Sequence, residues 1–462
     1  MSGALAGLLA DALRTLRHKV ESVDGEALGA AAIASSAEAV AQALSAAGVR
    51  ANEPVLVRIG NRPADLGALL GIWHAGAVAG PVHVTAAPTT PTALLKSTGA
   101  RFVADGERLE SCGDAPPLER PLLHGAALII FTSGSTGQPK GAVLGHDRFS
   151  GKLAVLDRLL KLRADDVVLL PLQLTFSFGM WVALLALRSG ARLILVPRFS
   201  TAAIARGLQA GATVLAGVPS MYRTLLADPA FAMPGLRLLM TGGEVLGKPL
   251  ALALRRAAPN AALYDLFGLT ETGTCDFVVA PADQPAGFGT IGVPTERVEY
   301  RIEAGELQIR TPFGMLGYLD NPELTAASFQ DGYFGTGDLA QLNSNGRVEL
   351  IGRSKDIISR GGNKIAPLEI DNLLCEHPDV AAALCAGVPD ERLGETIHAV
   401  VVARDGASVT SEQLRDWLLG RTERYKVPDR FYISDALPAG STGKADRRAV
   451  AALAQRAKPL VP

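Results

Sequence analysis

Residues 131–141 read FTSGSTGQPKG, a short stretch that combines four hydroxyl side chains with three glycines, a proline and a lysine. The apolar run AALII at residues 126–130 is typical of a buried strand, so the stretch should leave a sheet. Glycines let a chain curl until successive N–H groups point inward, and hydroxyls add donors around the same hollow. We interpret this stretch as a loop that binds a phosphate chain. A surface turn without a ligand is the alternative.

This loop departs from the common phosphate-binding loop, in which a lysine and then a Ser or Thr follow the second glycine. Here Pro139, which has no backbone N–H, stands at the position of the second glycine. Lys140 follows it, but the next residue is Gly141 and not Ser or Thr. The sequence therefore predicts a phosphate loop of another kind.

The composition is that of a globular enzyme with more than one domain. The chain has 462 residues, of which 48% are hydrophobic and 20% charged, and its formal net charge is −1. A domain with a single hydrophobic core rarely exceeds about 250–300 residues, so we expect two or more domains. The balanced charge, without a basic stripe, argues against a nucleic-acid partner. No uncharged apolar run reaches about 18 residues, so no membrane span is expected.

Two further features predict a cytoplasmic protein. Residues 1–20 have no basic segment ahead of their short apolar piece, which favours an amphipathic helix over a signal peptide. The cysteines share no metal-ligand spacing, and we interpret them as reduced thiols. They are Cys112, Cys275, Cys375 and Cys385.

The apolar pattern divides the chain into two parts and predicts an α/β fold. Through about the first 350 residues, short apolar runs alternate with Ala- and Leu-rich helical stretches, which indicates parallel-rich sheets covered by helices. After about Glu299, strands with tight turns predict a β-rich subdomain. We expect a large domain at residues 1–353 and a small mobile α+β domain at residues 354–462, joined at the charged turn GRSKD.

The small domain is predicted to contain two helices and two strands. We interpret APLEIDNLLCEHP, VAAALCAGVPD, ETIHAVVVAR and TSEQLRDWLLGR as helix, strand, helix and strand, in that order.

Several other segments carry groups that suit a nucleotide. Residues 264–273, YDLFGLTETG, place an aromatic ring beside a glycine and a hydroxyl beside a carboxylate, which suits a flat base and a hard cation on phosphates. Residues 240–246, MTGGEVL, end an apolar strand with two glycines, which permit a ligand to lie against the backbone. A helix start and an ordinary turn are the alternatives.

Asp338, in the segment YFGTGDLA, follows two glycines in a predicted turn, where its carboxylate can accept hydrogen bonds from both hydroxyls of a ribose. Further along, Arg353 and Lys355 stand at the expected domain boundary. Lys444 lies on a predicted turn in STGKADRRA. The alternative for Asp338 is an Asx turn, and the alternative for Lys444 is a solvent-exposed lysine without a role in the site.

These segments, in this order and at these spacings, resemble the adenylate-forming superfamily, which contains acyl- and aryl-CoA ligases, peptide-synthetase adenylation domains and firefly-type luciferases. The resemblance covers nearly the whole chain, and its character is closest to that of acyl- and aryl-CoA ligases. It implies an ATP-dependent enzyme that forms an acyl-adenylate from a carboxylic acid and transfers the acyl group to the thiol of CoA with release of AMP. ATP, Mg²⁺ and CoA are the implied cofactors.

The resemblance also implies a role for individual residues. Thr270 would touch the α-phosphate, Glu271 would hold Mg²⁺, and Lys444 would be the catalytic lysine that reaches in from the C-terminal domain. The residues implied to bind ATP are Thr132, Ser133, Gly134, Ser135, Thr136, Gly137, Lys140, Gly243, Glu244, Asp265, Leu266, Phe267, Gly268, Asp338 and Arg353.

In the same way, Lys355 matches the hinge position about which the small domain rotates to exchange Lys444 for the incoming thiol. The loop that lines the pantetheine channel is matched by Gly361, Gly362 and Lys364.

The acid is predicted to lack an α-amino group. In LTFSFGMW, residues 174–181, Ser177 stands where amino-acid-activating members carry an Asp, so a substrate ammonium would be buried unpaired at a cost of several kcal/mol. An aryl acid or a short to medium acyl chain is expected. The predicted pocket residues are Phe176, Ser177, Phe178, Gly242 and Gly268, while Met180 and Trp181 suit core packing nearly as well.

Three alternatives stay open. The acceptor could be the phosphopantetheine of a separate acyl carrier protein, although the segment RGGNKIAPLEID looks more like the CoA-ligase version of its loop. The chain could also be a nucleotide-binding relative that has lost catalysis. A homodimer is possible, because the region before the phosphate loop often contributes dimer contacts in this superfamily.

Overall fold

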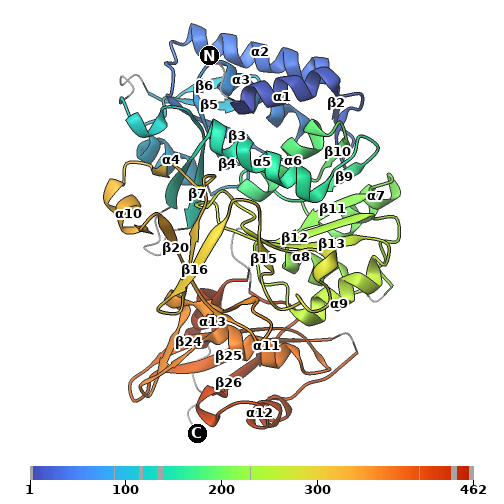
Figure 1. Cartoon of the computed structure of the whole chain (residues 1–462), viewed down its shortest axis with the longest axis vertical. Coiled ribbons are helices and arrows are strands. Elements are labelled where there is room, and N and C mark those ends of the chain that lie inside the picture. The colour runs from blue at the N-terminus through green and yellow to red at the C-terminus, as the bar shows by residue number, and fades with distance from the viewer. Residues whose placement is uncertain are drawn as a thin grey trace.

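Figure 1 shows the computed structural model, in which a large N-terminal part stands above a small C-terminal part that carries the C-terminus. The structure describes residues 4–87, 89–113, 118–133, 139–228, 230–404, 406–438 and 445–456. The mixed α/β architecture with a large sheet-containing part and a smaller C-terminal part confirms the predicted fold class.

The largest sheet within the described ranges has nine strands in the order β15-β14-β13-β12-β11-β9-β10-β1-β2. Its central neighbours pair in parallel, and antiparallel pairs occur only at its two ends. The bounds are β1 Val20–Ser22, β2 Ala27–Leu28, β9 Val167–Leu170, β10 Arg192–Leu195, β11 Val214–Gly217, β12 Leu238–Gly242, β13 Ala262–Phe267, β14 Phe277–Val279 and β15 Val293–Pro294.

The second sheet, counted over the same ranges, has seven strands in the order β18-β8-β7-β4-β3-β5-β6. Its middle strands β5, β3, β4 and β7 are parallel, while β8 turns back beside β7. The bounds are β3 Pro54–Ile59, β4 Val78–His83, β5 Phe102–Asp105, β6 Arg108–Ser111, β7 Ala126–Ser133, β8 Pro139–Gly145 and β18 Gly317–Tyr318.

Helices cover both sheets and join them through one core. Helix α3 packs on β3 and β4, α6 packs on β9 and β10, and α1 contacts α3, α5 and α6. Buried leucines of α1 confirm the expected amphipathic N-terminal helix. The bounds are α1 Ala4–Thr15, α2 Ala30–Ala46, α3 Pro63–His74, α4 Thr89–Thr98, α5 His146–Leu160, α6 Ser177–Arg188, α7 Thr201–Gln209, α8 Pro219–Leu225 and α9 Lys248–Ala257, with 3₁₀ turns η1 Pro121–Leu123 and η2 Pro281–Asp283.

A β-rich subdomain follows, as predicted, and its strands pair antiparallel. The bounds are β16 Glu299–Glu303, β17 Glu306–Arg310, β19 Phe329–Gln330, β20 Tyr333–Leu342, β21 Val348–Arg353 and α10 Pro322–Ala327. Asp338 lies within β20, so the prediction that it sits in a turn is wrong. The register of β20 against β17 shifts between Glu306 and Gln308, and this irregularity accommodates the positive φ of Gly337 inside a strand.

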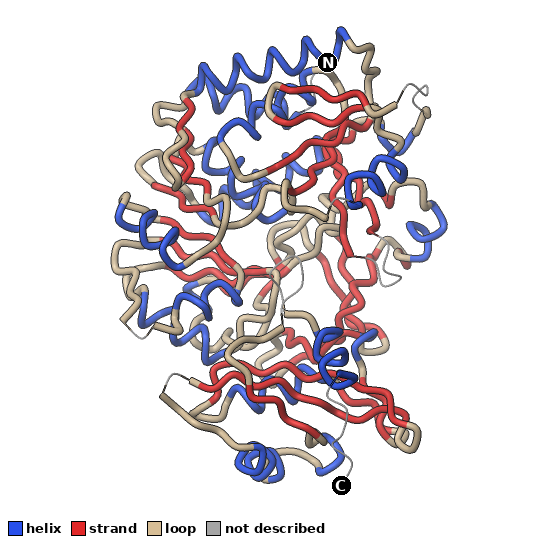
Figure 2. Tube along the Cα trace, turned by 180° about the vertical axis from the view of Figure 1, so that it is seen from behind, coloured by secondary structure: helices blue, strands red, loops and turns tan. Residues whose placement is uncertain are grey.

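The small C-terminal part has its own sheet and its own hydrophobic core. Figure 2 shows this sheet below the rest of the chain, with helices on its flanks. The bounds are η3 Ser354–Asp356, β22 Ile358–Arg360, β23 Asn363–Ile365, α11 Pro367–Cys375, β24 Val380–Asp390, β25 Gly394–Ala403, α12 Ser411–Leu419, η4 Arg424–Lys426, β26 Arg430–Ile433 and α13 Arg447–Arg456.

The predicted order helix, strand, helix, strand in this part is wrong at its last two positions. Residues 394–403 form strand β25, because their run of β-branched side chains pairs with β24 along its length. The next segment forms helix α12, whose start is fixed by a capping box between Thr410 and Gln413. The observed order is therefore helix, strand, strand, helix.

No helix within the described ranges is long and apolar enough to cross a membrane. All four cysteines are free.

Candidate active site

The predicted phosphate loop joins strands β7 and β8, which pair antiparallel. Thr132 on β7 lies opposite Lys140 on β8, so these two side chains flank the loop from its two sides. Residues 134–138, with the predicted contacts Gly134, Ser135, Thr136 and Gly137, lie outside the described residues, and so does the Ser133 side chain. The two ends of the loop are thus fixed by the sheet.

Glu271 lies beside this loop, although it is far away in the sequence. Its Oε1 accepts hydrogen bonds from Thr132 Oγ1 at 3.3 Å and from the Tyr318 hydroxyl at 3.1 Å. The Tyr318 ring in turn lies 5.4 Å from Lys140 Nζ. Burial and the nearby Glu271 carboxylate both raise the pKa of Tyr318, so its phenol stays a donor. The structure therefore brings the predicted metal ligand to the predicted phosphate loop.

The oxygen atoms around Glu271 fit a magnesium ion that arrives with a nucleotide. Mg²⁺ prefers oxygen ligands and is commonly held by one or two carboxylates together with water and substrate phosphates. Glu271 and Thr132 supply a carboxylate and a hydroxyl at the phosphate loop. The described part of the chain holds no cluster of three or more His, Cys, Asp or Glu suited to a metal ion.

Thr270 connects the phosphate site to the predicted acid pocket. Its hydroxyl oxygen lies 3.2 Å from that of Ser177, which begins helix α6. The Ser177 side chain is buried. This places the first residue of the acid-pocket helix next to the residue expected at the α-phosphate.

An aromatic pair follows Ser177 on helix α6. The rings of Phe178 and Trp181 stack with centroids 5.2 Å apart and planes 19° apart. Phe176 and Phe178 are half-buried, whereas Met180 and Trp181 are buried in the core between the sheets, which confirms their core-packing alternative. Only the first two can present substantial surface to a ligand in this structure.

Two glycines of the predicted pocket stand where a larger residue would not fit. A Cβ on Gly242 would lie 2.5 Å from the Leu266 carbonyl oxygen and 3.3 Å from the Phe178 ring. A Cβ on Gly268 would lie 2.3 Å from the backbone nitrogen of Cys275. The close approach of β12, β13 and the following turn therefore requires glycine at both positions.

A hollow beside β12 and β13 is lined by several of the residues predicted to bind ATP. Its lining includes the predicted residues Glu244, Asp265, Leu266 and Phe267. Gly243, at φ +83°, turns the chain toward it. The rest of the lining comes from separate segments: Val245, Leu246, Gly247, Gly289, Thr290, Ile291 and Leu350. Val245 and Leu246 belong to the segment MTGGEVL quoted above, whereas no local motif marks the others, because they converge only in the folded chain.

The acidic side chains of this hollow are held in different ways. The Glu244 carboxylate accepts a hydrogen bond from Ser220 Oγ at 2.8 Å and pairs with Arg223 at 3.4 Å, so helix α8 fixes its position. No cation pairs with Asp265 among the described residues, and removal from water raises its pKa to about 8. At neutral pH Asp265 is therefore mainly protonated and can donate as well as accept.

The predicted ribose residues face each other across two strands. Asp338 on β20 is opposite Arg353 on β21, and Arg353 Nε lies 2.8 Å from Asp338 Oδ1. The other oxygen, Asp338 Oδ2, is buried and has no hydrogen-bond partner among the residues that the structure describes. Burial raises the pKa of Asp338, and Arg353 opposes this shift. A buried acceptor without a partner suits a ligand hydroxyl, because leaving it unsatisfied is unfavourable.

Comparison with known proteins agrees with this geometry. A family model for AMP-binding enzymes matches residues 104–319, and the model for their C-terminal domain matches residues 369–444. The chain is 32% identical over 457 residues to a feruloyl-CoA synthase from an Amycolatopsis species, a match that covers 91% of this chain and 92% of that protein. The chain belongs to the AMP-binding enzyme family.

This chain is also similar to other members of the AMP-binding family. Oxalate–CoA ligase of Arabidopsis thaliana is 32% identical over 344 residues, covering 70% of this chain and 67% of that protein. ATP-bound MatB from Rhodopseudomonas palustris shares the fold with a TM-score of 0.86, at 25% identity and over 99% of both chains. The predicted superfamily and enzyme class are thus confirmed: the protein is an ATP-dependent, AMP-forming acid–thiol ligase of the CoA-ligase type.

The segment expected to serve the thiol step is a β-hairpin. Gly361 and Gly362 form its turn with φ values of +54° and +83°, and Lys364 Nζ donates to Ser359 Oγ at 2.6 Å across its strands. Lys355, the expected hinge, lies in η3 between β21 and β22, which belong to different sheets. The domain boundary at residues 353 and 354 stays a prediction.

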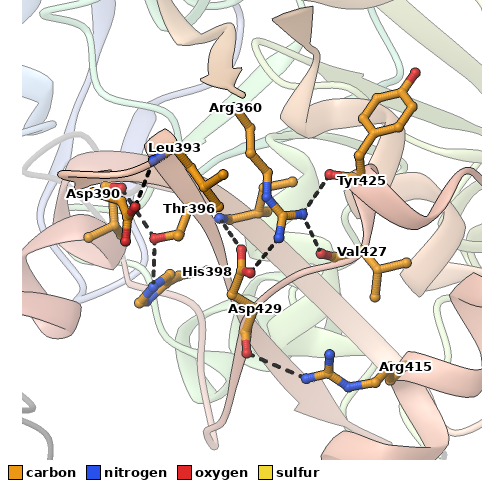
Figure 3. Close-up of polar contacts among 11 residues, drawn as sticks. Arg360, Asp390, Leu393, Thr396, His398, Arg415, Tyr425, Val427 and Asp429 are labelled. Carbon is orange, nitrogen blue, oxygen red and sulfur yellow. Dashed lines mark hydrogen bonds and ion pairs between the residues drawn. The ribbon is translucent and has the colours of Figure 1, made fainter. Parts of the chain in front are cut away.

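Arg360 fastens this hairpin to the segment at residues 425–429, which leads into β26 (Figure 3). Its guanidinium donates to the carbonyl oxygens of Tyr425 at 2.6 Å and Val427 at 3.1 Å, and it pairs with the Asp429 carboxylate. The same carboxylate accepts from the backbone nitrogen of Ile397 at 2.9 Å. The sequence did not indicate this role, because the partners lie some 65 to 69 positions away.

Lys444 lies outside the described residues, so its predicted catalytic position stays a prediction. The helix that follows it, α13, is anchored by Arg447, which donates to Asp371 and to the Cys385 carbonyl oxygen at 2.6 Å each. This anchor fixes the chain a few residues after Lys444 to the C-terminal sheet.

Proposed function

We propose that this AMP-binding enzyme joins an aromatic carboxylic acid without an α-amino group to CoA, with ATP as the activating substrate and Mg²⁺ on Glu271. The observation that carries the proposal is the contact between Ser177 and Thr270, with the half-buried ring of Phe178 next to Ser177 in the chain. A neutral hydroxyl and an apolar aromatic side chain therefore lie near the residue expected at the reacting phosphate. A planar substrate ring packs well on an aromatic side chain.

The charge of the pocket separates this substrate from other classes. The described residues that we assign to the acid pocket include no carboxylate to pair with an ammonium and no cation to pair with a second carboxylate. Burying either charge unpaired costs several kcal/mol. Amino acids and small dicarboxylic acids are therefore disfavoured, while aryl acids and short to medium acyl chains are accommodated.

The chemistry follows from the residues that meet at the loop. The acid is already ionised, so attack on the α-phosphate requires no general base. Its barrier comes from bringing two anions together and from charge that grows on the departing pyrophosphate. Mg²⁺, when bound, would neutralise part of that charge. In this chain Glu271 would hold the ion, Thr270 would orient the α-phosphate, and Lys140 with the loop donors would bind the outer phosphates.

The experiment is acid-dependent pyrophosphate exchange over a panel of aryl, aliphatic, dicarboxylic and α-amino acids, followed by thioester formation with CoA. We expect the highest kcat/KM with an aryl acid. Fastest exchange with an α-amino or dicarboxylic acid would contradict our interpretation of Ser177. If pyrophosphate exchange occurs but no CoA thioester forms, and the acyl group is transferred to a holo acyl carrier protein, the carrier protein is the acceptor in place of CoA.

We place this reaction in the cytoplasm, where ATP and CoA are both available. Four free thiols suit a reducing compartment. Light scattering on the same preparation measures whether the enzyme forms a homodimer.

A further inference from the structure

A buried ion pair lies beneath the turn that carries Thr270 and Glu271. Lys152 on helix α5 is 2% exposed and Asp276 is fully buried, with 3.7 Å between Lys152 Nζ and Asp276 Oδ1. Neither residue belongs to a motif that the proposed chemistry uses. Buried charges are costly unless they are paired and hydrogen-bonded, so this pair requires a physical reason.

Asp276 is bonded directly to the turn above it. Its Oδ2 accepts a hydrogen bond from the hydroxyl of Thr272, the residue after Glu271. Its backbone nitrogen donates to the Phe267 carbonyl oxygen at 2.6 Å, at the end of strand β13. The carboxylate and the backbone of Asp276 thus hold both ends of the segment that contains Thr270 and Glu271.

The backbone between this segment and Asp276 is strained. Gly273, Thr274 and Cys275 have φ values of +85°, +68° and +48°. A β-branched threonine is strongly disfavoured in this region, and such strain persists only where surrounding contacts impose it. Gly273 is also confined, because a Cβ there would lie 2.3 Å from the Phe313 carbonyl oxygen.

Lys152 reaches this strained backbone as well as the carboxylate. Its Nζ donates to Thr295 Oγ1 at 3.2 Å, and that hydroxyl donates to the Cys275 carbonyl oxygen at 2.9 Å. The ammonium also lies 5.5 Å from the Phe313 ring. Two residues further on, Met315 donates its N–H to the Glu271 carbonyl oxygen at 2.8 Å. The lysine is therefore connected to the turn from two sides.

We propose that Lys152, Asp276 and Thr272 are positioning residues that fix the strained turn so that Thr270 and Glu271 face the triphosphate and its metal ion. The inference rests on the proposed role of Glu271 as the magnesium ligand. None of the three side chains is assigned a contact with substrate, so their effect passes through the backbone of the turn.

The test is Thr272→Val compared with Thr272→Ser, because valine keeps the shape of threonine and loses only the hydroxyl. ATP binding is measured by titration calorimetry without acid, so that no turnover occurs, both with Mg²⁺ and with excess chelator. Supporting groups behind a metal ligand commonly contribute about tenfold or more to metal affinity. We expect Thr272→Val to weaken binding of Mg-ATP about tenfold, with metal-free ATP changed less than about twofold. Thr272→Ser should restore most of the loss.

Lys152→Met and Asp276→Asn give a second pair of variants, with thermal unfolding recorded for each. If Thr272→Val binds Mg-ATP like the wild type, or loses Mg-ATP and metal-free ATP equally, the positioning role is overturned. If the wild type itself gains no ATP affinity from Mg²⁺, the assignment of Glu271 has failed, and the positioning role falls with it. The acid panel above is unaffected by that result.

Discussion

The hydroxyl oxygens of Ser177 and Thr270 lie 3.2 Å apart, where the first turn of helix α6 meets the turn after strand β13. The two residues are 93 positions apart in the sequence. One belongs to the predicted acid pocket and the other to the predicted α-phosphate site. In the proposed reaction, the substrate carboxylate meets the α-phosphate next to this contact.

Replacing Ser177 with Asp should reduce kcat/KM for adenylate formation by about tenfold or more. A carboxylate here would repel both the acid and the phosphate, and like charges about 4 Å apart cost a few kcal/mol at the effective dielectric of a protein. Ser177→Ala removes one hydrogen bond, worth about 1 kcal/mol, and should cost about fivefold. Pyrophosphate exchange with the best acid measures both. Equal activity of the two variants would show that Ser177 does not face the reacting groups.

Replacing Asp338 with Asn should weaken the preference for ATP over 2′-deoxy-ATP. The buried Oδ2 of Asp338 has no hydrogen-bond partner within the described ranges, and a hydrogen bond from a ribose hydroxyl to this charged acceptor is worth about 1.5–3 kcal/mol. We expect the ratio of kcat/KM for the two nucleotides to fall about tenfold in the variant. A ratio that stays at its wild-type value would place the ribose elsewhere. Thermal unfolding of the variant checks that the Asp338–Arg353 pair is not needed for folding.

Replacing Arg360 with Met should slow the thioester step and leave adenylate formation unchanged. Arg360 ties the hairpin of Gly361 and Gly362 to the segment that ends at Asp429, and the variant frees that hairpin. We expect CoA-dependent turnover to fall about tenfold, since the lost charged hydrogen bonds are worth about 1.5–3 kcal/mol.

Arg415→Met is the matched control for Arg360→Met, because exposed Arg415 makes one long hydrogen bond, to the Asp429 carbonyl oxygen at 3.4 Å, and otherwise lies 5.9 Å from the centre of the Phe431 ring. It should leave both half-reactions intact. Equal loss of pyrophosphate exchange and thioester formation in Arg360→Met would indicate general damage to the small domain.

Replacing Asp265 with Asn should raise stability more at pH 8.5 than at pH 5. The pKa of Asp265 is raised from 3.8 to about 8, so the unfolded chain releases this proton at lower pH than the folded chain does. Between those two values the folded state binds more protons, and the wild type loses stability as pH rises. Asn has no proton to release. The difference in Tm between variant and wild type should therefore grow from pH 5 to pH 8.5; a constant difference would show that Asp265 ionises normally.

Local sequence was a good guide to the elements and a poorer guide to two of their details. The alternation of short apolar runs with Ala- and Leu-rich stretches predicted parallel-rich sheets covered by helices, because such periodicity reports which side of an element is buried. The segment at residues 394–403 was assigned to the wrong class, since its strand character depends on pairing with β24. Asp338 was predicted to lie in a turn because two glycines precede it. In the structure, pairing with neighbouring strands continues β20 through these glycines.

By itself, the sequence determined the family, the enzyme class and the residue types of the site, because phosphate, metal and base each need particular chemical groups close together in the chain. Only the tertiary structure decided how those groups meet. The approach of Thr132 and Tyr318 to Glu271, the contact of Ser177 with Thr270 and the buried pair of Lys152 with Asp276 each join residues of different segments. The physical reason is that helix packing and strand register bring residues together that are far apart in the sequence. A local pattern of side chains does not show which distant residues will come into contact.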